Sequence, residues 1–199
     1  MPFIGNIPTA IPLTGADIED GTVQIADLAA TGTKDATTFL RGDGTFASAG
    51  GDMTPAFQAI LSSTQTLSDN VETKIQFSNE VFDTNSCYDP TTNYRFTPNI
   101  AGKYYIFSRI WLDSNASNNF LSGSVSIFKN GSRLGRSYFQ VEGDGRQFSL
   151  DIDYIDTANG SSDYYEIYGH CDTSSGASPS VAYDASDIRN VFGAYKIIE

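Results

Sequence analysis

The pattern of hydrophobic positions is clearest in residues 96–112, FTPNIAGKYYIFSRIWL, and predicts a short strand, a turn and a long β-strand. From Lys103 onward nearly every residue is β-branched or aromatic, the types that favour strands. Alternate residues of a strand point to opposite faces. One face then holds Tyr104, Ile106, Ile110 and Leu112, and the other holds Tyr105, Phe107 and Trp111. Because both faces are apolar, we expect one to pack in the core and the other against a second copy of the chain.

Short segments of strand character recur after residue 53, with turn residues between them. They are residues 56–61, 71–78, 94–97, 103–112, 123–129, 133–141, 147–155, 164–171 and 190–198. Asn130-Gly131 supplies the two positive φ angles of a type I′ turn and predicts a hairpin, while residues 143–145 and Asn159-Gly160 are expected to make the next two turns. No stretch has a sustained helical period. The pattern therefore predicts an all-β jelly-roll sandwich.

The first 52 residues differ from the rest in composition. All 11 Tyr, the one Trp and all Phe except Phe3, Phe39 and Phe46 lie after Met53. A segment so poor in large apolar side chains cannot bury enough surface alone to offset the entropy lost on ordering. It is therefore either disordered or ordered against a partner, and we favour the partner, with residues 48–51 as a short joint before a domain boundary near residue 52.

Residues 1–20 carry prolines among single apolar residues. Proline lacks the N–H donor that a helix or a central strand needs, which predicts an extended arm lying along a surface, with a floppy terminus as the alternative. The anchoring residues of this arm are expected to be Phe3, Ile4, Ile7, Pro8, Ile11, Pro12 and Leu13.

The succession IPLTGADIEDGTV, ADLAATGT and TFLRGDGTF resembles the amino-terminal and shaft repeats of bacteriophage fibre proteins, whose chains wind together as trimers. The resemblance lies within the first 46 residues and keeps the family's order and spacing. It implies a virion protein made in the host cytoplasm. Residues 1–20 would anchor the chain to another virion structural protein, and residues 21–52 would form a short trimeric shaft and linker.

Four phrases of the second part, FTPNIAGKYYIF, VSIFKNG, DYYEIYG and VFGAYKII, are similar in order to strands of the globular heads of complement 1q and the tumour necrosis factors. The resemblance covers residues 54–199 and implies a jelly-roll head over residues 53–199 in a homotrimer. In that family the long strand and the last strand line the contact between subunits. The expected trimer-interface residues are Tyr105, Phe107, Trp111, Tyr164, Tyr168 and Tyr195. The chain has Ser162-Asp163 where the family usually has Gly-Asp, which leaves the form of that turn open.

The net charge, the length of the apolar runs and the cysteine spacing disfavour nucleic-acid binding, membrane insertion and a disulfide, respectively. Twelve Lys plus Arg against 24 Asp plus Glu give a net charge of -12 without a basic run, which disfavours nucleic acid. No apolar run approaches the roughly 20 residues of a membrane span, and Met1-Pro2-Phe3 opens no signal segment, so we expect no membrane insertion. Cys87 and Cys171 have no CxxC spacing, and two unpaired, partly buried thiols are favoured over a disulfide.

Groups for catalysis or metal binding are sparse, and we expect neither an enzyme nor a cofactor. His170 is the sole histidine and no GxSxG elbow accompanies it, which favours a structural or surface role. Asp151, Asp153 and Asp156 are spaced more widely than the ligands of most calcium loops, so a solvated sheet face is favoured over a metal site.

Arg41-Gly42-Asp43 spells an integrin-binding tripeptide. The glycines at positions 42 and 44 are also the residues that a tight turn between Leu40 and Phe46 needs. A turn is therefore the favoured interpretation of this segment.

Two long polar loops, residues 113–119 and 173–178, are the candidates for contact with a receptor. Loops on a rigid β scaffold often carry binding residues, and amides and hydroxyls beside an aromatic side chain suit carbohydrate, although ordinary connectors have the same composition. The candidate receptor residues are Asp113, Asn115, Asn118, Asn119, Ser174, Ser175 and Tyr183.

These features together predict a structural fibre protein of a bacteriophage that presents a trimeric head to a host-surface glycan or protein. Three linked weak sites can bind a repetitive surface far more tightly than one. The alternative is a capsid decoration, cement or head-fibre protein with the same arm and trimer. A glycan-cleaving tail enzyme is disfavoured because the chain shows no recognisable carboxylate-pair motif.

Overall fold

The computed structural model describes residues 31–33, 35, 38–48, 53–116, 119–141, 145–174, 176 and 178–198. The chain divides into two units, Met1–Gly51 and Asp52–Glu199. The predicted arm over residues 1–20 lies outside the described residues, and so do Asn118, Ser175 and the Gly143-Asp144 part of one predicted turn.

The described part of the first unit contains an antiparallel hairpin of β1 (Thr38–Leu40) and β2 (Phe46–Ser48). The Arg41-Gly42-Asp43 tripeptide lies in the turn between these strands. The N–H of Arg41 donates to the carbonyl of Thr45 (2.8 Å), and Asp43 Oδ1 accepts from the hydroxyl of Thr45 (2.6 Å). Gly44 has a φ of +79°, a conformation that favours glycine. The turn expected at this tripeptide is confirmed.

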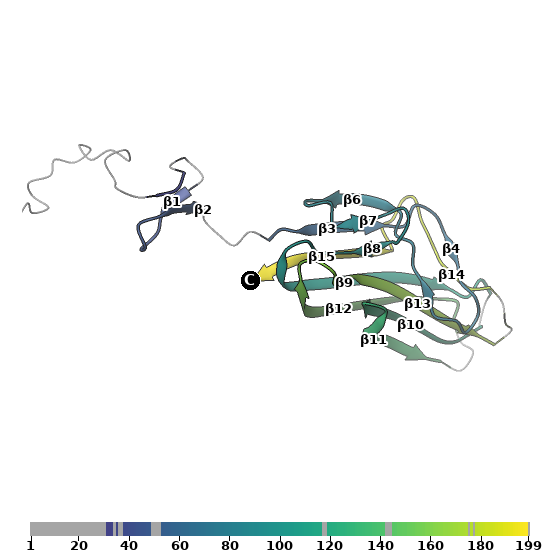
Figure 1. Cartoon of the computed structure of the whole chain (residues 1–199). Helices are drawn as coiled ribbons and strands as arrows, with labels where there is room; N and C mark the ends of the chain where they lie inside the picture. The colour runs from purple at the N-terminus through teal and green to yellow at the C-terminus, as the bar shows by residue number, and fades with distance from the viewer. Residues whose placement is uncertain are drawn as a thin grey trace, which may run out of the picture. The chain divides into compact units, whose positions relative to one another are not determined.

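The second unit, the head, consists of two antiparallel sheets (Figure 1). The β9 sheet contains β3 (Ala56–Ile60), β4 (Gln65–Thr66), β6 (Asn79–Asp83), β9 (Ala101–Asp113), β12 (Gln147–Asn159), β14 (Ser180–Val181) and β15 (Val191–Ile198). The β10 sheet contains β5 (Thr73–Lys74), β7 (Tyr88–Asp89), β8 (Arg95–Phe96), β10 (Phe120–Lys129), β11 (Ser132–Gln140) and β13 (Tyr165–Thr173). No described residue belongs to a helix long and apolar enough to cross a membrane.

The strand order identifies the head as a jelly roll. The β9 sheet has the order β4-β14-β9-β15-β3-β6, with β12 on the other side of β9. The β10 sheet has the order β11-β10-β13-β8-β7, with β5 also paired to β13. The first and last long strands, β3 and β15, are neighbours, so the chain enters and leaves the head at the same end (Figure 1). The all-β fold predicted from the sequence is confirmed.

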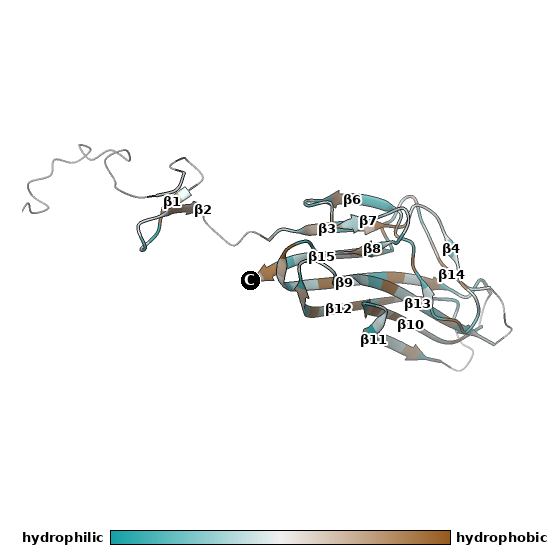
Figure 2. Ribbon diagram, in the orientation of Figure 1, coloured by the Kyte–Doolittle hydropathy of each residue, from teal (hydrophilic) through white to brown (hydrophobic). Residues whose placement is uncertain are grey.

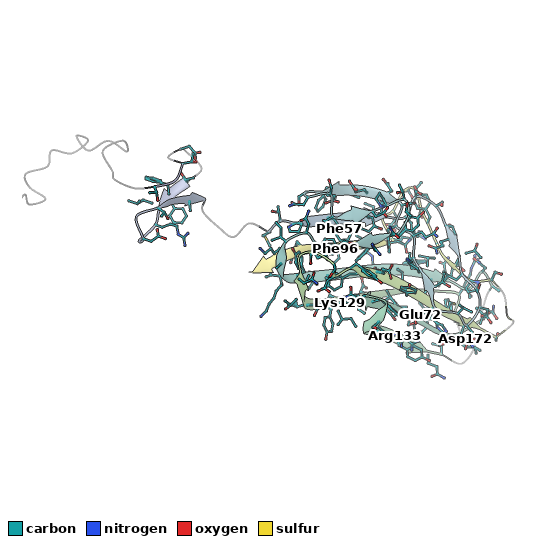
Figure 3. All side chains as sticks on the ribbon, viewed as in Figure 1. Phe57, Glu72, Phe96, Lys129, Arg133 and Asp172 are labelled. Atoms are coloured by element: carbon teal, nitrogen blue, oxygen red, sulfur yellow. The ribbon has the colours of Figure 1, made fainter. Side chains whose placement is uncertain are left out.

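The hydrophobic core lies between the two sheets, and the strands alternate between hydrophobic and hydrophilic residues (Figure 2). Tyr104, Ile106, Ile110 and Leu112 of β9 are fully buried, which confirms the inner face expected for this strand. Phe57 and Phe96, labelled in Figure 3, stack from opposite sheets with their ring centroids 4.7 Å apart. Complete burial of such a side chain contributes about 1.5–3 kcal/mol, so this aromatic contact is a principal link between the sheets.

The long strands lie close to their predicted ranges, whereas the short ones were harder to predict. Of the segment predicted at residues 71–78 only β5 is a strand, and β4, β6, β7 and β14 lie outside the predicted segments. Asn130 and Gly131 have φ angles of +52° and +78°, and they connect β10 to β11. The predicted type I′ hairpin is therefore confirmed.

The turn before β13, which the sequence left open, is organised by Asn159. Its Oδ1 accepts hydrogen bonds from the backbone N–H groups of Ser161, Ser162 and Asp163 at 3.0–3.1 Å. The carboxylate of Asp163 accepts in return from the N–H of Asn159 (3.0 Å) and from Nδ2 of Asn130 (2.8 Å). The turn thus needs no glycine at position 162, because side-chain hydrogen bonds from two neighbouring turns hold it.

Candidate functional site

The outer face of the β9 sheet carries a group of aromatic side chains that no described part of the chain covers fully. The ring centroid of Tyr105 lies 5.8 Å from that of Phe107 and 5.5 Å from that of Tyr195. All three residues are of intermediate exposure. We call Tyr105, Phe107 and Tyr195 the aromatic patch. Burial raises the pKa of Tyr105, and nearby Asp153 adds to this effect, so its hydroxyl is neutral at physiological pH.

Gly193 allows the patch to form. It lies directly opposite Phe107 across β9 and β15, and a Cβ at this glycine would lie 2.5 Å from Cζ of Phe107. The phenyl ring therefore rests on bare backbone. On the neighbouring strand Ile155 lies opposite Tyr105 and is 57% exposed, so the apolar surface extends onto β12. The patch and Ile155 thus form neighbouring apolar positions on three adjacent strands of the outer face.

Two of the predicted interface residues lie on the other sheet, apart from the aromatic patch. Tyr168 is in β13 of the β10 sheet and packs against Phe128, with ring centroids 4.3 Å apart. Tyr164 precedes β13, and the guanidinium of Arg95 lies 4.5 Å from its ring centroid. Alternation along a strand predicts which residues share a face, but it cannot predict to which of two sheets the strand belongs. The structure does not bring Tyr164 and Tyr168 to the aromatic patch.

Toward the far end of β9 the same outer face becomes charged. Arg109 lies opposite Asp151 of β12, and Phe107 lies opposite Asp153. A hollow of about 360 Å³ joins the two regions, because its lining includes Tyr105 and Phe107 of the patch as well as Arg109 and both aspartates. Both aspartates are exposed, as the sequence indicated for a solvated sheet face. Among the described residues no cluster of three or more His, Cys, Asp or Glu could hold a metal ion.

Residues 183–190 form a loop at this charged end, and Asn190 attaches it to β9. Oδ1 of Asn190 accepts from the backbone N–H of Trp111 (2.7 Å), and its Nδ2 donates to the carbonyl of Ala182 (2.6 Å). Arg109 of β9 also holds the loop, because its Nη2 donates to the carbonyl of Ile188 (2.7 Å) and its Nε donates to the carbonyl of Arg189 (3.2 Å). The loop is therefore held in one conformation over the sheet.

Arg189 covers Trp111, which separates this tryptophan from the other predicted interface residues. Its guanidinium lies 4.9 Å from the indole centroid and pairs with Asp184 (2.7 Å) and Asp187 (3.3 Å). Arg109, Arg189 and Asn190 were not predicted from the sequence. Their roles depend on contacts between segments about 80 positions apart, and no local pattern signals such contacts.

Asp113, predicted to face a receptor, is buried instead and holds the loops together. It accepts from Arg146 Nε (3.0 Å), from Gln147 Nε2 (2.6 Å) and from the N–H of Asn115 (2.7 Å). Burial acts to raise the pKa of Asp113, but the hydrogen bonds from Arg146 and Gln147 outweigh it and keep the pKa below its ordinary value. Asp113 is only 5% exposed, so its carboxylate is not accessible to a large ligand.

The other receptor candidates divide into structural and exposed residues. Asn119 is also buried, and its Oδ1 accepts from the hydroxyl of Ser174 (2.6 Å), so one predicted loop is tied to the other. Asn115 makes a similar link through Nδ2 to the carbonyl of Ser178 (2.7 Å). Tyr183 is 39% exposed and remains available to a partner. These loops lie at the end of β9 away from the entry of the chain into the head (Figure 1).

The remaining candidate groups have structural surroundings. Nε2 of His170 lies 3.0 Å from Oδ1 of Asn70, and burial lowers the pKa of this histidine, so it is neutral at pH 7. Cys87 and Cys171 are unpaired and buried, which confirms two free thiols. Burial raises the pKa of Cys171 to about 12 and also raises that of Cys87, so neither is a reactive thiolate.

No protein-family model matches the chain, and no curated protein was found similar to it. Solved structures do resemble it. Murine APRIL at pH 5.0 has 10% identity and a TM-score of 0.52, over 71% of this chain and 98% of that chain. Eiger TNF from S. frugiperda has 11% identity and a TM-score of 0.50, over 74% and 95%. The globular domain of zebrafish complement 1qA has 14% identity and a TM-score of 0.48, over 73% and 99%.

At such low identity these likenesses show the fold alone. The head has a jelly-roll fold like those of murine APRIL and Eiger TNF, and the predicted jelly roll is confirmed.

Proposed function

We propose that this chain is a structural fibre protein of a bacteriophage virion, with a homotrimeric head that binds a receptor on the host surface. The aromatic patch is the observation that carries the proposal. Tyr105, Phe107 and Tyr195 form a continuous apolar surface on the outside of a folded jelly roll. A second copy of the chain is the partner that would cover this surface in every molecule.

Trimeric assembly is supported by two independent resemblances. The phrases before residue 47 resemble fibre shafts that wind as trimers, and the head resembles a fold family whose long and last strands line a subunit contact. In this chain those strands are β9 and β15, which carry all three residues of the aromatic patch. Interfaces between identical subunits are more apolar than the rest of the surface, which agrees with the character of the patch.

Receptor binding is assigned to the loop end of the head. Two hydrogen bonds join described residues of these loops: Nδ2 of Asn115 donates to the carbonyl of Ser178, and the hydroxyl of Ser174 donates to Oδ1 of Asn119. Groups that are already held in place lose less entropy on binding, and three copies in one trimer would multiply a weak affinity. Residues 1–20 would hold the chain on another virion structural protein.

Labelling intact particles tests the assignment. Gold-labelled antibodies against the head are expected to mark the ends of fibres, and purified protein is expected to compete with infection of the host. Label spread over the icosahedral faces, with no competition, would instead identify a capsid decoration protein. Shortening of host polysaccharide by the purified protein would point to an enzyme.

A further inference from the structure

We propose that a hollow at the loop end of the β9 sheet binds the carboxylate of an acidic saccharide. The hollow has a volume of about 150 Å³ and is lined by Arg109, Trp111, Ser149, Asp187, Ile188 and Arg189. We call it the arginine hollow. The inference rests on the proposed function, because a host-surface glycan would supply the saccharide.

The first argument is an unused hydrogen-bond donor. Nε1 of Trp111 is buried and has no hydrogen-bond partner among the described residues. An indole N–H can only donate, and buried donors without a partner are rare because the hydrogen bond to water that is lost on burial is not replaced. Trp111 also lines the arginine hollow, and a carboxylate oxygen bound there is the acceptor that we propose for this donor.

The second argument is charge. Arg109 uses Nε and Nη2 to hold two loop carbonyls and forms none of the ion pairs seen in the described residues. A guanidinium has five N–H donors, so several remain for a ligand. Arg189 also lines the hollow, and its guanidinium pairs with Asp184 and Asp187. Arg109 is therefore the group whose positive charge we propose for an anion, in a chain of net charge -12.

The geometry favours a carboxylate over a more highly charged anion. Arginine binds the planar carboxylate through two parallel hydrogen bonds, and both guanidinium groups are already held in place by other contacts. Asp187 borders the hollow and Asp151 lies opposite Arg109, so a dianion such as phosphate would meet two negative charges. Asp187 and the hydroxyl of Ser149 are exposed and suit the hydroxyl groups of a sugar ring.

The single tryptophan makes a direct test possible. Trp111 is the only Trp in the chain, so its fluorescence reports on the arginine hollow alone. The full chain is titrated with galacturonate, glucuronate and N-acetylneuraminate, with galactose and inorganic phosphate as comparisons. We expect a saturable change in emission with at least one acidic sugar and none with galactose. An equal response to galactose, a response to phosphate only, or no response to any acidic sugar would overturn the inference.

Substitutions test whether the acidic sugar binds in the arginine hollow. Arg189→Gln is expected to weaken binding about tenfold or more, the loss typical of one hydrogen bond to a charged group. Trp111→Phe removes the indole N–H and is measured by calorimetry, with a similar loss expected. Arg136→Gln is the matched control, because Arg136 is an exposed arginine of β11 on the β10 sheet. Equal binding by Arg189→Gln and wild type, or equal loss in the control, would contradict the site.

Sugar binding, assembly and adhesion can be measured on the same purified protein, so the two proposals can fail independently. A trimer that adheres to host cells but binds no acidic sugar would refute the arginine hollow and leave the fibre assignment intact. A chain that binds galacturonate through Arg189 but neither assembles nor labels virions would support the hollow and refute the fibre assignment.

Discussion

Gly193 is the residue on which the shape of the aromatic patch depends. The phenyl ring of Phe107 lies where a side chain at position 193 would begin. Because the ring rests on β15, its face stays accessible beside Tyr105 and Tyr195. One missing Cβ therefore determines the contour of the proposed subunit contact.

Gly193→Ala is expected to lower the free energy of unfolding by about 1–3 kcal/mol, because the new Cβ displaces Phe107. Urea denaturation followed by circular dichroism measures the change. Gly42→Ala is the control, since a Cβ there has no atom within 4 Å, and its effect should stay within about 0.5 kcal/mol. Equal stability of Gly193→Ala and wild type would show that Phe107 is free to move.

Asp113 predicts a dependence of stability on pH. The pKa of Asp113 is lowered in the folded head, whereas the pKa of an Asp in an unfolded chain is about 3.9. As the pH falls the unfolded chain therefore takes up the proton first, so the contribution of Asp113 is complete above about pH 5 and is lost as the pH falls through the lowered pKa. Asp113→Asn should cost about 1–2 kcal/mol at pH 7, a modest loss because Arg146 is half exposed.

The difference between Asp113→Asn and wild type should shrink when unfolding is measured between pH 5 and pH 2. Glu80→Gln is the control, because Glu80 is exposed on β6 and takes part in none of the described ion pairs. A difference that stays constant across this pH range would mean that Asp113 is not held as a carboxylate.

At the scale of elements, the sequence was informative where a strand is long and alternates. β9, β10 and β15 were predicted because their inner faces are apolar over several residues. β4, β7 and β14 have two residues each, too few for any period, and they exist because neighbouring strands pair with them. The sequence predicted Asp113 and Asn119 in one loop, but Asp113 is the last residue of β9. The burial of both residues depends on distant partners such as Arg146 and Ser174, which no local pattern signals.

The hairpin of β10 and β11 can be tested separately. Asn130 has a φ of +52° and joins the turn to Asp163 and to the N–H of Tyr164. Asn130→Ala should destabilise the head by about 1–3 kcal/mol, since it removes two hydrogen bonds and alanine tolerates a positive φ less well than asparagine does. Both variants are compared with wild type by thermal melting, and Ser132→Ala, in the exposed start of β11, should be nearly neutral. A neutral Asn130→Ala would mean that Gly131 alone determines the turn.

At the scale of the whole molecule, the outer face of the β9 sheet divides into two regions. The aromatic patch lies toward the end where the chain enters and leaves the head, and the arginine hollow lies toward the loop end. Assembly through the first region would leave the second near the receptor-facing loops. The sequence indicated the patch through its double apolar face, but the hollow arises only when the loop at residues 183–190 folds over Trp111.

The solution mass of the purified full chain tests the central proposal most directly. Light scattering across a range of concentrations should give three times the chain mass of 21.5 kDa for wild type. Tyr105→Asp should give a single chain, because it puts a charge in the aromatic patch, whereas Tyr154→Asp changes an exposed tyrosine of β12 outside the patch and should remain trimeric. A stable wild-type monomer at every concentration would contradict the account.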